Sequence, residues 1–73
     1  MKNQIEKLAK NISGEELKIT MIIYGQNGEK IIYLDKDFNA NMQIVLQEDN
    51  SYKAINNPLT LKEEIFCGEL SAC

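Results

Sequence analysis

The sequence contains no histidine, no arginine and no tryptophan, and each absence narrows what the 73-residue chain can do. Histidine is the side chain whose ordinary pKa lies nearest neutrality, and it is also the commonest metal ligand. Arginine supplies the planar fork that binds phosphate or carboxylate groups at two points. Without these side chains we expect no catalytic residue, no cofactor and no bound metal, and we predict that the protein is not an enzyme.

Charge and hydropathy patterning point away from nucleic-acid and membrane partners. Eight lysines face eleven acidic residues, so the net charge is −3, and the lysines are scattered rather than gathered into the basic block that nucleic-acid binding usually requires. Even the longest purely apolar runs, such as Met21–Tyr24, are far shorter than the roughly 20 residues of a membrane span, and no apolar signal segment follows Met1. We therefore expect a cytoplasmic protein. The bias toward isoleucine, asparagine and lysine is typical of a bacterial or phage gene.

The length allows a single small domain over residues 1–73, and hydrophobic periodicity predicts its first element. Four apolar positions recur at helical spacing near the N-terminus, and Gly14 follows them where a helix commonly ends in a left-handed residue. These positions are Ile5, Leu8, Ala9 and Ile12. The pattern predicts a helix over residues 2–12.

Residues 17–24 change to the alternation of a strand, and residues 31–34 supply a returning strand. Asn27-Gly28 between them is the strongest short signal for a hairpin with a two-residue loop. Such a loop predicts a register in which Tyr24 lies opposite Ile31, and Ile22 opposite Tyr33. One face of the hairpin then forms the core, with Leu17, Ile19, Met21, Ile23, Ile32 and Leu34. The other face carries Ile22, Tyr24, Ile31 and Tyr33.

The rest of the chain predicts further strands and a second helix. Residues 42–47 have the alternation of a third strand, and residues 48–51 are a cluster of turn-forming residues. Residues 52–55 are a short possible fourth strand. Thr60 and Glu63 match a capping box, and helical spacing follows through Leu61, Ile65, Phe66 and Leu70. The expected fold class is α+β: a small antiparallel sheet of three to four strands with an N-terminal and a C-terminal helix, in the order α-β-β-β(-β)-α.

The hairpin face with Ile22, Tyr24, Ile31 and Tyr33 is the main candidate for function. The solvated face of an antiparallel sheet is usually polar, whereas this one is apolar and carries two tyrosines, a composition enriched at protein interfaces. A second helix covering this face, or the preference of tyrosine and isoleucine for strands, explains the same pattern. Our first hypothesis is a small non-enzymatic protein-interaction or regulatory module that binds a protein partner, or a second copy of itself, through this face.

A second hypothesis is an acidic inhibitor that occupies a basic, nucleic-acid-binding cleft of another protein. Attraction between opposite charges would guide such binding and make it sensitive to salt. The modest net charge of −3 places this hypothesis second. The carboxylates that would carry it lie beside the predicted strands and at the start of the predicted last helix: Asp35, Asp37, Glu48, Asp49, Glu63 and Glu64.

Two further motifs give incomplete signals. A run of alternating oxygen ligands matches the opening of a calcium loop, but Ala40 and Leu46 replace the glycine and the closing glutamate of that loop. Cys67 and Cys73 stand six residues apart, a spacing that fits neither a redox pair nor a zinc site. A third hypothesis is a ribosomal precursor peptide whose C-terminal Cys73 tail awaits modification. The alternating oxygen ligands that match the opening of a calcium loop are Asp35, Asp37, Asn39 and Asn41.

Overall fold

A computed structural model describes residues 2–36, 39–56 and 64–70, and its first element is helix α1 (Lys2–Ser13). Ile5 and Ala9 fall on the inner side of this helix and are fully buried. The helix ends at Gly14, whose N–H donates to the Lys10 carbonyl at 2.8 Å and whose φ of 77° is open to glycine because it has no Cβ. The helix predicted over residues 2–12 is confirmed.

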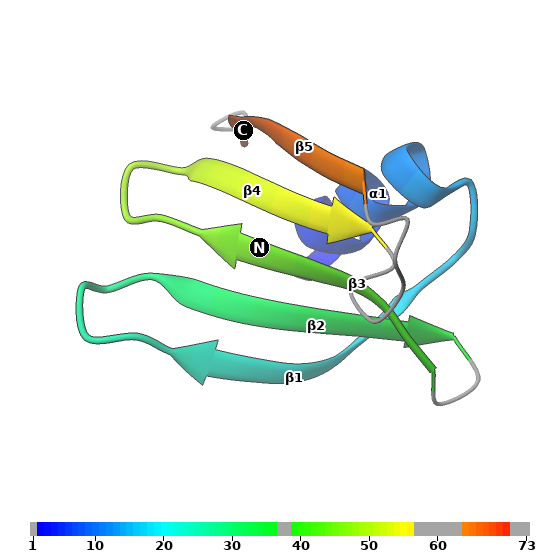
Figure 1. Ribbon diagram of the computed structural model, residues 1–73, viewed down its shortest axis with the longest axis horizontal. Helices are drawn as coiled ribbons and strands as arrows, with labels where there is room; N and C mark the ends of the chain where they lie inside the picture. Colours follow the sequence, from blue (N-terminus) through cyan, green and yellow to red (C-terminus); the bar gives the residue numbers. More distant parts are fainter. Residues whose placement is uncertain (1, 37–38, 57–63, 71–73) are drawn as a thin grey trace.

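Within the described residues, five strands follow the helix and form one antiparallel sheet in which the strand order is the chain order. They are β1 (Lys18–Tyr24), β2 (Lys30–Lys36), β3 (Asn39–Leu46), β4 (Ser51–Asn56) and β5 (Glu64–Glu69). Strands β1 and β5 form the two edges, and α1 lies behind the sheet in the view of Figure 1. The predicted α+β class is confirmed, with five strands in place of three or four. The sequence left undecided whether residues 52–55 form a fourth strand, and they do so as part of β4.

The hairpin between β1 and β2 has a three-residue loop, Gln26–Gly28, and the predicted two-residue loop is wrong. The Gly25 N–H donates to the Glu29 carbonyl at 2.8 Å across this loop. A two-residue type I′ turn at Asn27-Gly28 would need a positive φ at both residues, but Gly28 alone of the two has one, at 80°. A type I turn followed by one left-handed residue fits this arrangement and adds one residue to the loop.

The extra loop residue shifts the pairing of β1 by one position, so the side chains of residues 21–24 lie on the faces opposite to those predicted. Ile22 pairs with Ile32 and packs against the core, whereas Met21 and Ile23 pair with Tyr33 and Ile31 on the opposite face. The predicted core position of Met21 and Ile23 is therefore wrong. A bulge between Ile19 and Met21 shifts the register again, which returns Ile19 to the core side, as predicted.

Strand β5 occupies residues for which the sequence predicts a C-terminal helix, so that prediction is wrong for residues 64–69. Ile65 and Phe66 are β-branched and aromatic residues that favour strands, and Gly68 weakens a helix interior by about 1 kcal/mol. Tyr52 on β4 offers Gly68 a cross-strand partner that an isolated helix would not have. The capping-box residues Thr60 and Glu63 lie outside the described residues.

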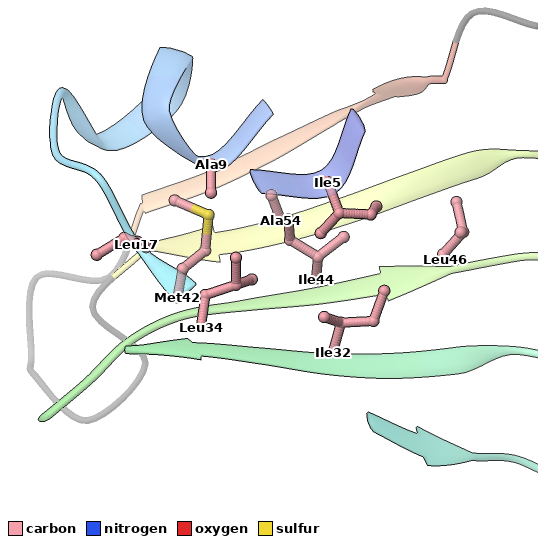
Figure 2. Packing of buried hydrophobic residues seen from close by; sticks show 9 residues of the cluster. All are labelled: Ile5, Ala9, Leu17, Ile32, Leu34, Met42, Ile44, Leu46 and Ala54. Carbon is pink, nitrogen blue, oxygen red and sulfur yellow. The ribbon is translucent and has the colours of Figure 1, made fainter. Parts of the chain in front are cut away.

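The core lies between α1 and one face of the sheet (Figure 2). In Figure 2, Ile5 and Ala9 of α1 lie above side chains from the three central strands, β2, β3 and β4. Leu8, Ile12, Ile19, Ile22, Tyr52 and Leu70 pack around this cluster and are partly buried. The buried cluster consists of Ile5, Ala9, Leu17, Ile32, Leu34, Met42, Ile44, Leu46 and Ala54.

Candidate functional site

The face of the sheet that points away from α1 is the candidate site, and we call its ten central residues the open face. Strand pairing aligns them in two rows across all five strands, because paired residues of neighbouring strands share a face. The first row contains Met21, Tyr33, Gln43, Ile55 and Ile65. The second row contains Ile23, Ile31, Val45, Lys53 and Cys67.

The open face is apolar and partly exposed. The exposed fraction is 55% for Met21, 52% for Ile65 and 44% for Ile23, and Cys67 is a free, exposed cysteine. Its remaining apolar members, Ile31, Tyr33, Val45 and Ile55, are half-buried. Only Gln43 and Lys53 interrupt the apolar surface, whereas the solvated face of an antiparallel sheet normally carries polar residues. On a folded protein, an exposed apolar patch of this kind commonly marks an interaction site.

Polar residues border the open face at both ends of the strands. At one end Lys18 pairs with Asp35, and Asp35 lines a shallow depression together with Met21 and Tyr33. At the other end Ser51 pairs with Glu69. An apolar centre with a polar rim is the usual composition of a protein–protein interface.

The structure brings together half of the residues that the sequence assigns to a binding face. Ile31 and Tyr33 lie on the open face, as predicted. Ile22 packs against the core on the opposite side, and Tyr24 is 69% exposed at the end of β1 on the side of Ile22. The one-residue error in the hairpin register causes both differences.

Sequence reasoning missed eight members of the open face, six of which are apolar or thiol side chains. The alternation of β3 and β4 was sufficient to place Val45 and Ile55 opposite the buried Ile44 and Ala54. Ile65 and Cys67 were hidden by the prediction of a helix, and Met21 and Ile23 by the predicted hairpin register.

The acidic residues of the second hypothesis that the structure describes do not form one surface. Asp35 lies near the end of β2, and Glu48 and Asp49 lie in the loop between β3 and β4, at the opposite end of the sheet in Figure 1. Glu64 begins β5, and Asp37 and Glu63 lie outside the described residues. The Asp49 Oδ1 accepts hydrogen bonds from the Ser51 hydroxyl at 2.6 Å and the Ser51 N–H at 3.0 Å, which lower the pKa of Asp49 below its ordinary value.

The calcium and cysteine motifs find no support among the described residues. No group of three His, Cys, Asp or Glu side chains there could hold a metal ion. The Asn41 Oδ1 accepts from the Lys36 N–H at 3.3 Å, which ties β3 to the end of β2. Asp37 and Cys73 lie outside the described residues, and so the precursor-peptide hypothesis, which depends on Cys73, gains no observation.

Comparison with known proteins adds no information about function. Neither protein-family models, nor curated proteins, nor solved structures gave a match to this chain. Within the part of the chain that the structure describes, no helix combines the length and the apolar character that crossing a membrane would require. The open face is therefore the feature on which a functional proposal must rest.

Proposed function

We propose that this protein is a small non-enzymatic interaction module, of a bacterial or phage type, that binds a protein partner through the open face. The observation that carries the proposal is the pair of rows across five strands, in which eight of ten residues are apolar, aromatic or thiol side chains. Covering apolar surface contributes roughly 25 cal/mol for each Å² removed from water. A partner that covers these side chains would therefore gain substantial binding energy.

Tyr33 is the residue that best suits an anchoring role in this interface. It lies on β2, one strand in from the edge, between Met21 of β1 and Gln43 of β3. Tyrosine combines a large apolar ring with a polar hydroxyl group, and such residues often dominate the energy of protein interfaces. Lys53 in the neighbouring row would favour a partner that presents a carboxylate near its apolar contact.

The test compares three variants: Tyr33→Ser and Ile65→Ser on the open face, and Tyr24→Ser on the other side of the sheet. Tyr24 provides a matched control because the same tyrosine-to-serine change is made on a different face. Each variant is used to capture proteins from an extract of the cells that produce the protein, and the captured proteins are identified by mass spectrometry. We expect one captured protein to be lost with Tyr33→Ser and Ile65→Ser and retained with Tyr24→Ser.

The affinity for that purified partner should fall by about tenfold or more with each open-face variant, since removing an interface anchor typically costs more than 1 kcal/mol. It should change little between low and high salt, because apolar contacts are not screened. Urea unfolding of the variants checks that they remain folded. Binding that survives both open-face changes, or that is abolished by salt alone, would reject the open face and favour the acidic inhibitor.

A further inference from the structure

The free edge of β1 carries backbone groups whose direction follows from the hairpin. The Gly25 N–H donates to the Glu29 carbonyl, so Gly25 and Glu29 form a hydrogen-bonded pair. Such pairs alternate along an antiparallel ladder with pairs whose backbone groups point outward. Tyr24, paired with Lys30, and Ile22, paired with Ile32, are therefore outward pairs. The N–H and C=O groups of Ile22 and Tyr24 point away from β2, toward the free edge.

One half of this edge is protected and the other half is not. The N–H of Ile19 donates to the Glu6 carboxylate of α1 at 3.3 Å, and the bulge that follows Ile19 interrupts the regular edge. Lys18 adds a charge at the same end. Bulges and lysines are the devices by which proteins prevent edge-to-edge pairing. The segment Met21–Tyr24 has neither, and within the described residues no hydrogen bond is found to its outward groups.

We infer that β1 pairs antiparallel with β1 of a second copy of this chain, about a two-fold axis at Ile22. In this register each Ile22 exchanges both backbone hydrogen bonds with its copy, and Met21 lies opposite Ile23 of the second copy. Both cross-strand pairs are apolar, and no like charges face each other. In Figure 1, α1 lies behind β4 and β5, and its hydrogen bond to β1 is made at Ile19, outside the segment Met21–Tyr24.

The other edge is less suited to self-pairing. Strand β5 begins at Glu64 and ends at Glu69. The Leu70 N–H donates to the Asn50 carbonyl, so by the same alternation Ile65, Cys67 and Glu69 carry the outward backbone groups of β5. A two-fold axis at Cys67 would place Ile65 opposite Glu69 of the second copy, so an apolar side chain would face a charge at each end of the pair. The β1 edge is therefore the one that selects a second copy of this chain.

Pairing at β1 would extend the open face across two copies. Met21 and Ile23 lie on the open face, so the two rows of each copy would continue into the rows of the other as one ten-stranded sheet. The inference concerns the edge and not the face, and it does not depend on the proposed function. A partner could still bind the open face of a monomer if the edge pairing failed.

The test measures the solution mass of the reduced full chain by light scattering over a concentration series. We expect the mass to rise from 8.3 kDa toward twice that value with wild type and with Tyr24→Ser. In this register the Tyr24 N–H donates to the Thr20 carbonyl of the second copy on each side of the Ile22 pair. Tyr24→Pro removes both of these hydrogen bonds from the dimer while leaving the ladder to β2 intact, because proline is tolerated where an edge N–H faces away from the sheet. This variant should stay at the monomer mass, with an unchanged circular dichroism spectrum.

Hydrogen exchange on wild type provides a readout that needs no variant. The amide protons of Ile22 and Tyr24 should become protected as the concentration rises, whereas in a monomer they would exchange freely. Free exchange in a concentrated sample, or a dimer that persists with Tyr24→Pro, would overturn the inference. A dimer that Ile65→Ser dissociates and Tyr24→Pro does not would also overturn it, in favour of contact between open faces. Loss of partner capture with Tyr33→Ser is scored separately, so the two proposals can fail independently.

Discussion

Two residues with positive φ set the geometry of the two hairpins that are closed by three-residue loops. Gly28 has a φ of 80° in the β1–β2 loop, and Asn50 has a φ of 69° in the β3–β4 loop. In the second loop the Gln47 N–H donates to the Ser51 carbonyl at 2.8 Å, which matches the Gly25–Glu29 bond in the first. Glycine and asparagine are the residues that adopt this conformation at least cost. Each hairpin thus depends on one residue at the same place in its loop.

The left-handed backbone conformation of Asn50 predicts that Asn50→Ala is less stable than Asn50→Gly. The loss of side-chain contacts alone would not predict this difference. Asn50→Ala should lower the free energy of unfolding by about 1 kcal/mol, because alanine has no local hydrogen bond to compensate its Cβ clash at positive φ. Asn50→Gly should change it by no more than about 0.5 kcal/mol. Urea unfolding monitored by circular dichroism measures both values.

Asn27 provides the control for this prediction. It is the same residue type in the other loop, but its φ is not positive, so Asn27→Ala should cost less than about 0.5 kcal/mol. A cost for Asn27→Ala equal to that of Asn50→Ala would indicate a two-residue type I′ turn at Asn27-Gly28. The register of β1 and the composition of the open face would then both be wrong.

At the scale of elements, the helix and the first three strands are predictable from the sequence, and the register of the first hairpin is not. The helical spacing of Ile5 and Ala9 finds α1, and alternation finds β2 and β3. Asn27-Gly28 is compatible with a two-residue and a three-residue loop, which differ by local turn energies that periodicity does not report. Because side chains alternate with period two, this single residue decides whether Ile22 or Ile23 enters the core.

Strand β5 was not predictable because its stabilising contacts come from another element. Helical spacing through Ile65 and Phe66 is also consistent with a short strand, since short apolar segments are ambiguous between the two. The contact that favours the strand is with Tyr52, whose ring lies so close to Gly68 that a Cβ at Gly68 would approach the Tyr52 hydroxyl oxygen to 2.7 Å. Four of the ten open-face residues, Met21, Ile23, Ile65 and Cys67, were hidden in this way or by the β1 register.

The Tyr52–Gly68 contact predicts a selective loosening of β5. Tyr52→Ala should lower the free energy of unfolding by about 1–3 kcal/mol, because it removes a half-buried ring that packs on the core and covers the glycine. Tyr52→Phe keeps the ring and should cost less than about 0.5 kcal/mol. Hydrogen exchange should show the amides of β5 losing protection before those of β2 and β3. Equal loss over all strands would mean that this contact does not hold β5 individually.

For the whole molecule, the two faces of the sheet have different roles, one in folding and the other in the proposed binding. The face toward α1 contains the buried core, and the open face contains apolar side chains that are only partly covered. A chain of 73 residues has a net stability of roughly 4–11 kcal/mol, so it depends heavily on each large core residue. The open-face residues contribute less to folding if they serve a partner. This division can be measured on one strand.

Ile44 and Val45 are neighbours on β3 and point to opposite faces of the sheet. Ile44 is fully buried, so Ile44→Ala should lower the free energy of unfolding by about 2–5 kcal/mol, a large part of the total. Val45 is half-buried on the open face, so Val45→Ala should cost about 1 kcal/mol or less. Urea unfolding at low protein concentration, where the chain is monomeric, compares the two. Equal costs would mean that the open face is already covered in the monomer, and the proposed binding surface would then be a second core.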